Sequence, residues 1–163
     1  MTIFFLYTII LVIVLAFVHW LSYSYLKSDI ISRRKWSLNV CCGNTDGGGV
    51  NADIVRHYDV PRFDKLLNIY NLPYSNGQFE WVLCSHTVEH VEDPSRLDRE
   101  LRRVGKNVVY ILPPLWDIGA TLNILEHKWI FITLKKNHRS LPKYVKLPGS
   151  ETAQKLFGQF IKA

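Results

Sequence analysis

Residues 37–54, SLNVCCGNTDGGGVNADI, set two short apolar segments on either side of a glycine-rich turn. The segments at 37–40 and 50–54 have the length and composition of buried strands. Glycine adopts positive φ at little cost and lets a ligand approach the backbone, so the turn is a candidate ligand loop. Only about eight residues, 42–49, join the two strands, and the helix that normally crosses between parallel strands is expected to be missing. The second strand ends on Asp53.

Three further strand patterns follow, at 65–67, 79–84 and 107–112. An Asp-Pro pair favours the start of a helix over 94–104, which carries an apolar residue at every turn. Strands that alternate with helices predict an α/β fold with a Rossmann-like, mostly parallel sheet and flanking helices. Another helix is expected after the two prolines that follow the last of these strands, because four apolar residues recur there: Leu115, Ile118, Leu122 and Leu125.

The C-terminal part contains two apolar runs, 129–134 and 144–147, which are separated by a basic loop and predict an antiparallel hairpin. Residues 150–163 then predict an amphipathic helix with Ser150 as its cap. We expect its apolar stripe to pack on the domain's own sheet, with a partner subunit or the membrane surface as alternatives. The stripe consists of Ala153, Leu156, Phe157, Phe160 and Ile161.

The N-terminal segment is different in kind, because residues 1–26 contain no Lys, Arg, Asp or Glu, whereas the whole chain has a net charge of +6. This segment predicts one transmembrane helix, followed by a basic juxtamembrane linker at 27–36 and a domain at 37–149. The basic residues after the helix place the domain in the cytoplasm. A cleaved signal peptide is the alternative, but a basic start and a small-residue cleavage site are lacking. Aromatic residues suited to the headgroup level end the helix: Trp20, Tyr23 and Tyr25.

The carboxyl ends of parallel strands meet at one edge of a sheet, where ligands bind. The turn at Gly43, the carboxylate of Asp53 and the amide of Asn68 would all lie on that edge. A carboxylate such as Asp53 can accept both hydroxyls of a ribose, and Asn68 with a neighbouring backbone amide can recognise an adenine edge.

The order of these segments resembles that of the class I S-adenosylmethionine-dependent methyltransferases, in particular those with a methyltransferase type 11-like domain. The segments that carry the resemblance are NVCCGN at 39–44, VNADI at 50–54, NIYNLPY at 68–74, QFEWVLCSHTVEHV at 78–91 and RELRRV at 99–104. The resemblance implies S-adenosylmethionine as cofactor and methyl transfer as the reaction. The cofactor-binding residues that it implies are Asn39, Cys41, Gly43, Asp53, Asn68, Ile69 and Ser85.

The chain departs from the family pattern in its first motif, where Cys41 stands at the usual glycine and Asn39 at a position that is often acidic. Asn68 likewise replaces an acidic residue on the adenine side, and Glu80 stands where the family usually has Asp. These departures, together with the small size of the domain, favour an alternative to an enzyme. That alternative is a non-catalytic, methyltransferase-like scaffold or accessory subunit of a membrane complex.

The chemistry implied by the resemblance is mainly positioning, and a base is needed only when the methyl acceptor must lose a proton. His86 is the candidate catalytic base, while His90 is expected to pack beside the fourth strand. Residues 86–90, HTVEH, also form an H-x-x-E-H pattern that binds zinc on a helix. A helix would have to begin directly after a buried strand and stop by Pro94, so no metal site is predicted.

Composition limits the remaining possibilities. The chain is 48% hydrophobic, which excludes a disordered tail, and its three cysteines exclude a disulfide scaffold. A basic stretch between Glu126 and Glu151 predicts contact with anionic lipid headgroups or a solvated loop, and nucleic acid is not an expected partner. The sequence therefore predicts a membrane-anchored methyltransferase that acts on a lipid, a quinone-like small molecule or a membrane-associated protein group.

Overall fold

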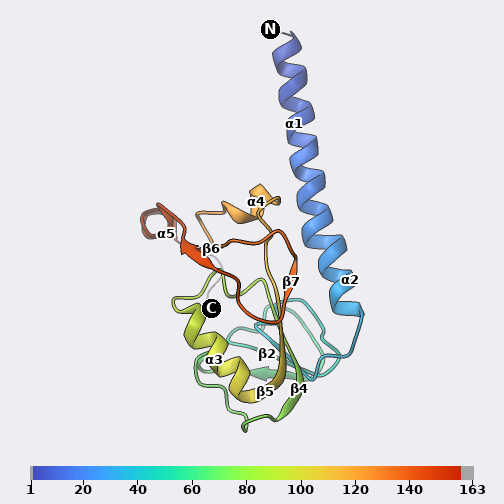
Figure 1. Cartoon of the computed structure of the whole chain (residues 1–163), viewed down its shortest axis with the longest axis vertical. Coiled ribbons are helices and arrows are strands. Elements are labelled where there is room, and N and C mark those ends of the chain that lie inside the picture. The colour runs from blue at the N-terminus through green and yellow to red at the C-terminus, as the bar shows by residue number, and fades with distance from the viewer. Residues whose placement is uncertain (1, 159–163) are drawn as a thin grey trace.

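The computed structural model describes residues 2–158. A six-stranded sheet with the order β3-β2-β1-β4-β5-β7 forms the centre of the domain (Figure 1). All neighbouring strands are parallel except β5 and β7. The strands are β1 Leu38–Val40, β2 Val50–Asp53, β3 Phe63–Lys65, β4 Phe79–Ser85, β5 Gly105–Ile111 and β7 Asn137–His138. The predicted α/β class with a mostly parallel sheet is confirmed.

The strand order reverses between β1 and β4, because β2 and β3 lie on one side of β1 whereas β5 lies beyond β4. Residues Leu38–Val40 pair with Val50–Ala52 on one side and with Val82–Cys84 on the other. In an open parallel sheet the crevice at such a switch point, beyond the carboxyl ends of the strands, is where ligands bind. The topology thus places the candidate ligand site at the carboxyl ends of β1, β2 and β4.

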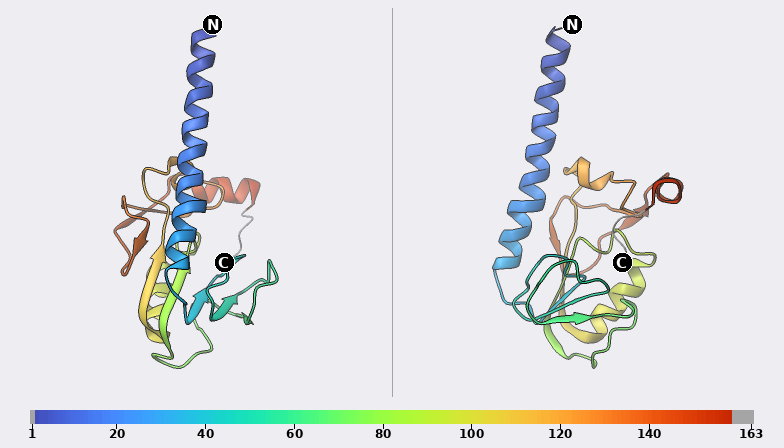
Figure 2. Two further views of the ribbon diagram at one scale, coloured as in Figure 1. Left: turned by 90° about the vertical axis from the view of Figure 1, so that its right-hand side faces the viewer. Right: turned by 180° about the vertical axis from the view of Figure 1, so that it is seen from behind.

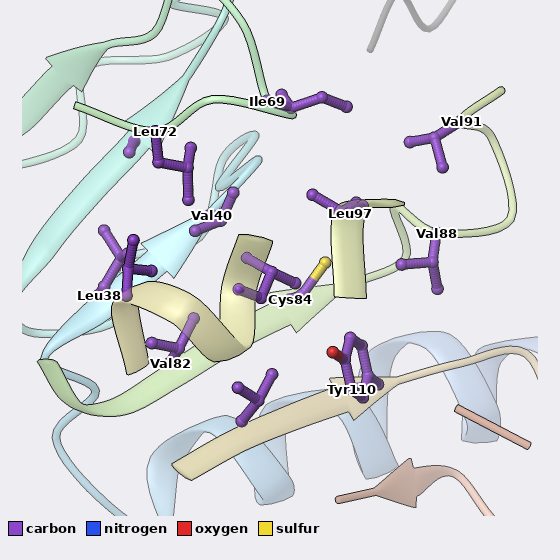
Figure 3. Packing of buried hydrophobic residues seen from close by; sticks show 14 of the residues in the cluster. Leu38, Val40, Ile69, Leu72, Val82, Cys84, Val88, Val91, Leu97 and Tyr110 are labelled. Atoms are coloured by element: carbon purple, nitrogen blue, oxygen red, sulfur yellow. The ribbon is translucent and has the colours of Figure 1, made fainter. Parts of the chain in front are cut away.

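Helix α3, Pro94–Val104, covers one face of the sheet. The Asp93 side chain caps it by accepting from the backbone N–H of Arg96 at 2.9 Å. Leu97, Leu101 and Val104 are fully buried because they recur on the face that meets the sheet. Figure 3 shows Leu97 among sheet residues, including Leu38, Val40, Val82 and Cys84.

Two polar residues of α3 also fix the loop that leads into β4. The Glu100 carboxylate accepts from the backbone N–H of Leu72 at 2.6 Å. The Arg103 guanidinium donates to the carbonyls of Leu72 and Tyr74 at 2.9 and 2.7 Å. These bonds give the segment at 99–104 a structural role.

The N-terminal helix is continuous and covers part of the other face of the sheet (Figure 2). It consists of α1 Thr2–Trp20, a π-helical turn η1 Leu21–Leu26 and α2 Lys27–Ser32. Ile30 and Trp36 are buried against Leu83, Val109 and Ile111. Residues 27–32 of the expected linker at 27–36 are helical, because Ile30 has an apolar surface to pack on.

One helix of the described chain, Ile3–Ser32, is long and apolar enough to cross a membrane, and none of its most apolar window is buried in the protein. Its first residues project away from the domain in every view, whereas its C-terminal third lies against the domain (Figures 1 and 2). The helix is therefore both a candidate membrane span and a part of the folded domain.

The glycine-rich turn is held against the start of β1, and it contains no helix. The backbone N–H of Trp36 donates to the carbonyl of Gly47 at 2.8 Å, and the Asn39 amide donates to the carbonyl of Thr45 at 2.8 Å. A Cβ on Gly49 would lie 2.3 Å from the carbonyl oxygen of Trp36, so this position accepts only glycine. The predicted loss of the first crossover helix is confirmed.

Helix α4 is shorter than predicted, whereas the strands that follow it agree with the prediction. Helix α4 spans only Ile118–Thr121, because the apolar residues that suggested a longer helix, Ile118, Leu122 and Leu125, are exposed and have no core to pack on. Strands β6 Trp129–Phe131 and β8 Tyr144–Lys146 form the predicted antiparallel hairpin.

Helix α5, Ser150–Phe157, also differs from its prediction. Gly149 precedes it in the left-handed region, and the Ser150 hydroxyl donates backwards to the carbonyl of Leu147 instead of capping the helix. Ala153 is buried, but Leu156 and Phe157 are more than two-thirds exposed, so the stripe does not complete the core. The predicted stripe residues Phe160 and Ile161 lie outside the described residues.

Candidate functional site

A pocket of about 320 Å³ opens at the carboxyl ends of β1, β2 and β4. It lies where the strand order reverses, as expected for a ligand site in such a sheet. We call it the sheet-edge pocket. Its lining comes from the ends of these strands and from the N-terminal helix, and consists of Tyr23, Lys27, Cys41, Cys42, Gly43, Asn44, Asp53, His57, Tyr58, Ser85, His86, Thr87 and His90.

Asp53 is the acidic residue of this pocket, and it is almost completely buried. One carboxylate oxygen accepts from the backbone N–H of Gly43 at 3.0 Å, and the other accepts from that of Ile54 at 2.7 Å. Each oxygen of an ionised carboxylate can accept a second hydrogen bond. Asp53 therefore holds the turn after β1 and keeps acceptor capacity for a ligand hydroxyl.

Two residues of the pocket have strained backbones. Cys41 has φ 53° and His86 has φ 51°, which is the left-handed region that favours glycine. Non-glycine residues in this region are frequent at ligand sites, where the surrounding structure holds them. The motif that this segment resembles usually has glycine at the position of Cys41. The left-handed conformation explains that preference, because glycine adopts it at little cost.

Ser85 supplies a further polar group to the pocket. Its hydroxyl oxygen is buried and makes no hydrogen bond to any part of the chain that the structure describes. A buried polar atom without a partner costs free energy, so a ligand that bonds to it gains stability. A Cβ added to Gly43 would meet nothing within 4 Å, which leaves room beside the turn.

Three of the predicted cofactor-binding residues do not line this pocket. The Asn39 side chain bonds to Thr45 and Asn51 and so supports the turn from behind. The carboxamide of Asn68 is exposed and accepts from the backbone N–H of Tyr70. Ile69 is buried in the hydrophobic core (Figure 3).

A second pocket of about 430 Å³ lies between the N-terminal helix and α4. We call it the helix-side pocket. Tyr23, His86 and His90 line both pockets, so the two share a wall. The remaining lining residues are His19, Gly119, Ala120, Asn123 and His127.

A buried chain of charged and polar groups passes through that shared wall. The Lys136 ammonium donates to Nε2 of His86 at 2.8 Å, and Nδ1 of His86 lies 3.1 Å from the Glu89 carboxylate. Because Nε2 accepts a hydrogen bond, the ring proton is on Nδ1 and is donated to Glu89. Lys136 also donates to the hydroxyl of Ser22 on the N-terminal helix at 2.9 Å. The helix is thereby tied to the site.

The electrostatics of this chain of groups follow from burial. Burial lowers the pKa of His86 to about 4 and that of Lys136 to about 8. Burial alone would raise the pKa of Glu89, but the hydrogen bond from His86 and the electrostatic interactions with His86, His90 and His127 together outweigh it and lower that pKa to about 2. At pH 7 the imidazole of His86 is therefore neutral and lies between an ammonium group and a carboxylate.

Sequence reasoning missed Tyr23, Lys27, His127 and Lys136. The last two are distant in sequence from the strand ends, and nothing in their local pattern indicates a site. For the N-terminal helix a signal was present, because His19 and Ser22 are polar residues inside a mainly apolar segment. His19 bonds to the Asp117 carboxylate at 3.1 Å and Ser22 is fully buried. Polar residues in such a helix usually face a protein surface.

Residues 55–112 match the family model described as a methyltransferase domain. The matched region contains β3, β4, α3 and β5, and it begins just after Asp53. This match supports the predicted resemblance over these residues, whereas the motif at 39–44 lies outside it. No curated protein matches the chain.

Several solved structures align with the chain at low identity. The YcgJ protein from Bacillus subtilis is 18% identical, with a TM-score of 0.41, over 55% of this chain and 50% of its own. A possible histamine N-methyltransferase from Thermotoga maritima is 18% identical, with a TM-score of 0.41, over 60% and 55%. The PH0226 protein from Pyrococcus horikoshii is 17% identical, with a TM-score of 0.46, over 80% and 77%. This chain thus spans about half the length of the first two of these proteins.

Proposed function

We propose that this chain is a membrane-anchored, S-adenosylmethionine-dependent methyltransferase that acts on a lipid or quinone-like small molecule. The observation that carries this proposal is the shared wall of the two pockets, formed by Tyr23, His86 and His90. One pocket lies at the strand ends, where the cofactor of such a fold binds, and the other lies beside the apolar helix. The family match at 55–112 supports the same activity.

The sheet-edge pocket offers the groups that S-adenosylmethionine requires. Asp53 would accept the ribose hydroxyls, and the backbone beside Gly43 would approach the cofactor closely. Lys27 would neutralise the carboxylate of its methionine part. The ring of Tyr58, which lines the pocket and is more than half exposed, would stack on the adenine, whereas the sequence suggested recognition of the adenine edge by Asn68 and a neighbouring backbone amide.

The position of the helix-side pocket favours an acceptor that arrives from the membrane. Residues 3–20 span roughly 27 Å at about 1.5 Å per residue, close to the roughly 30 Å of a hydrocarbon core. The domain therefore begins at the membrane surface, where His19 bonds to Asp117 just before α4. Helix α4 lies beside the N-terminal helix (Figure 1). In α4 and the residues that follow it, four apolar side chains are exposed: Ile118, Leu122, Ile124 and Leu125. They suit contact with lipid.

Bound S-adenosylmethionine supplies an electrophilic methyl group, so the protein mainly has to align an acceptor with it. Tyr23, His86 and His90 stand at the junction where such an acceptor would lie. An acceptor hydroxyl must lose a proton, and the neutral imidazole of His86 is the candidate to accept it at Nε2. His86 must then exchange its hydrogen bond from Lys136 for one from the acceptor.

The remaining surfaces fit a protein held at a membrane. The basic residues after the apolar helix favour a cytoplasmic domain, since basic residues flank membrane spans on that side. The exposed Leu156 and Phe157 of α5 offer a surface to a partner subunit or to the bilayer.

Transfer of a labelled methyl group tests this function. The full chain is placed in lipid nanodiscs that contain mixed phospholipids and isoprenoid quinols, and is incubated with S-adenosylmethionine labelled in its methyl group. The proposal predicts that label enters the fraction extracted into organic solvent. Label found only in protein would point to a protein acceptor, and label in no fraction would contradict methyl transfer to these acceptors.

A graded substitution tests whether the acceptor uses the helix-side pocket. Gly119 lines this pocket, and a Cβ added there meets nothing within 4 Å. Gly119→Phe should fill the pocket and abolish label transfer while leaving cofactor binding unchanged, whereas the matched control Gly119→Ala should retain transfer. Equal transfer by both variants would place the acceptor elsewhere.

A further inference from the structure

We propose that Glu89, His90 and His127 form a binding site for a divalent transition-metal ion such as Zn²⁺. All three side chains are buried, and each has a potential ligand atom within 4.8 Å of those of the other two. Two imidazoles and one carboxylate are a donor set that Zn²⁺ and Fe²⁺ bind in proteins.

The hydrogen bonds around the cluster leave its ligand atoms available. One carboxylate oxygen of Glu89 and the Nδ1 atom of His127 are buried and make no hydrogen bond within residues 2–158. Such orphaned atoms are rare because they cost free energy, and here two of them belong to the same three-residue cluster. A metal ion would satisfy both.

The third ligand is oriented by the backbone. Nδ1 of His90 lies 3.0 Å from the carbonyl oxygen of Glu126, which requires the ring proton to be on Nδ1. Nε2 of His90 then carries a free lone pair. Histidines that bind metals commonly donate their other ring N–H to a carbonyl or carboxylate in this way. The second oxygen of Glu89 is fixed similarly by His86.

The fold brings together ligands that are far apart in the chain. The carbonyl of Glu89 accepts from the backbone N–H groups of Lys128 and Trp129 at 2.7 and 3.2 Å. The turn after β4 is therefore bonded directly to the segment that carries His127.

This site differs from the H-x-x-E-H arrangement weighed from the sequence. Residues 86–90 form a turn rather than a helix, and His86 is engaged by Lys136 and Glu89. His127 supplies the second imidazole instead. Because His90 and His127 line the helix-side pocket, a ligand bound there would reach the open coordination positions. An acceptor hydroxyl on the ion would have a lowered pKa, a role that rests on the proposed function.

Metal content of the purified full chain tests the site. The protein, in detergent and without an affinity tag, is loaded with Zn²⁺, freed of unbound ion by gel filtration and analysed by mass spectrometry for metals. We expect one Zn²⁺ per chain in the wild type and loss of that ion in Glu89→Gln and in His127→Gln. The matched control His57→Gln, which alters a histidine outside the cluster, should keep it.

Two further readouts separate loss of a ligand from loss of the fold. Co²⁺ in place of Zn²⁺ should give visible absorption bands in the wild type and none in His127→Gln. Zn²⁺ should raise the melting temperature of the wild type but not of that variant, since ligand binding stabilises the folded state. A wild type that retains no metal, or a His127→Gln variant that retains it, would overturn the proposal. Cofactor titration without metal reports separately on the proposed function.

Discussion

Asp53→Ala is expected to weaken binding of S-adenosylmethionine by roughly 5- to 150-fold. Loss of hydrogen bonds to a charged group costs about 1 to 3 kcal/mol, and this free energy converts to that range of dissociation constants. The carboxylate also holds the turn through the backbone N–H of Gly43, so its loss should loosen the wall of the sheet-edge pocket. Calorimetric titration of the full chain in nanodiscs measures the change.

Two variants separate the role of Asp53 from a general effect of charge. Asp59→Ala removes an equal charge from a side chain that is 94% exposed and lies outside the pocket, and it should bind as the wild type does. Asp53→Asn keeps one oxygen acceptor and should fall between wild type and Asp53→Ala. Equal affinity of Asp53→Ala and wild type would remove Asp53 from the cofactor site.

Gly49→Ala should destabilise the domain strongly, although it adds only one methyl group. The new Cβ would lie 2.3 Å from the carbonyl oxygen of Trp36 and 2.6 Å from that of Ser37. Both contacts are to backbone, which cannot rotate away as a side chain can. We expect a cost of at least about 3 kcal/mol, the upper end of overpacking effects, and a melting temperature lower by roughly 6 to 12 °C.

Gly119→Ala is the matched control for this prediction, because the same methyl group would meet nothing within 4 Å. It lies in α4, where alanine is favoured over glycine, so its melting temperature should equal or exceed that of the wild type. Tryptophan fluorescence during heating provides the measurement. If Gly49→Ala had the same melting temperature as the control, the turn would not lie against the start of β1.

The parts of the fold that the sequence predicted are those with a strong local pattern. Strands β4 and β5 each contain a run of buried apolar residues, at 82–84 and 108–111, and α3 combines a cap with an apolar residue at each turn. The edge strand β3 lies two residues earlier than expected, since two of its three residues are exposed and its pattern is weak. Local patterns also located Asp53 and Gly43, because the end of a strand fixes the edge of the sheet on which they lie.

The parts that could not be predicted depend on contacts between distant segments. No local pattern indicates that Lys136 meets His86, which is 50 residues away, or that His127 meets Glu89. The N-terminal helix was expected to end at residue 26, yet it continues to Ser32 because its last turns pack on the sheet. A candidate membrane span and a wall of the sheet-edge pocket are thus parts of one helix, a combination that hydropathy alone does not reveal.

The proposed function depends above all on binding of S-adenosylmethionine in the sheet-edge pocket, which titration of the wild-type full chain measures. The chain, held in nanodiscs, is titrated calorimetrically with S-adenosylmethionine and, separately, with its demethylated product. We predict saturable binding of each ligand at one site per chain, with competition between the two. Absence of binding of both at millimolar concentration would contradict this function and would favour a non-catalytic scaffold.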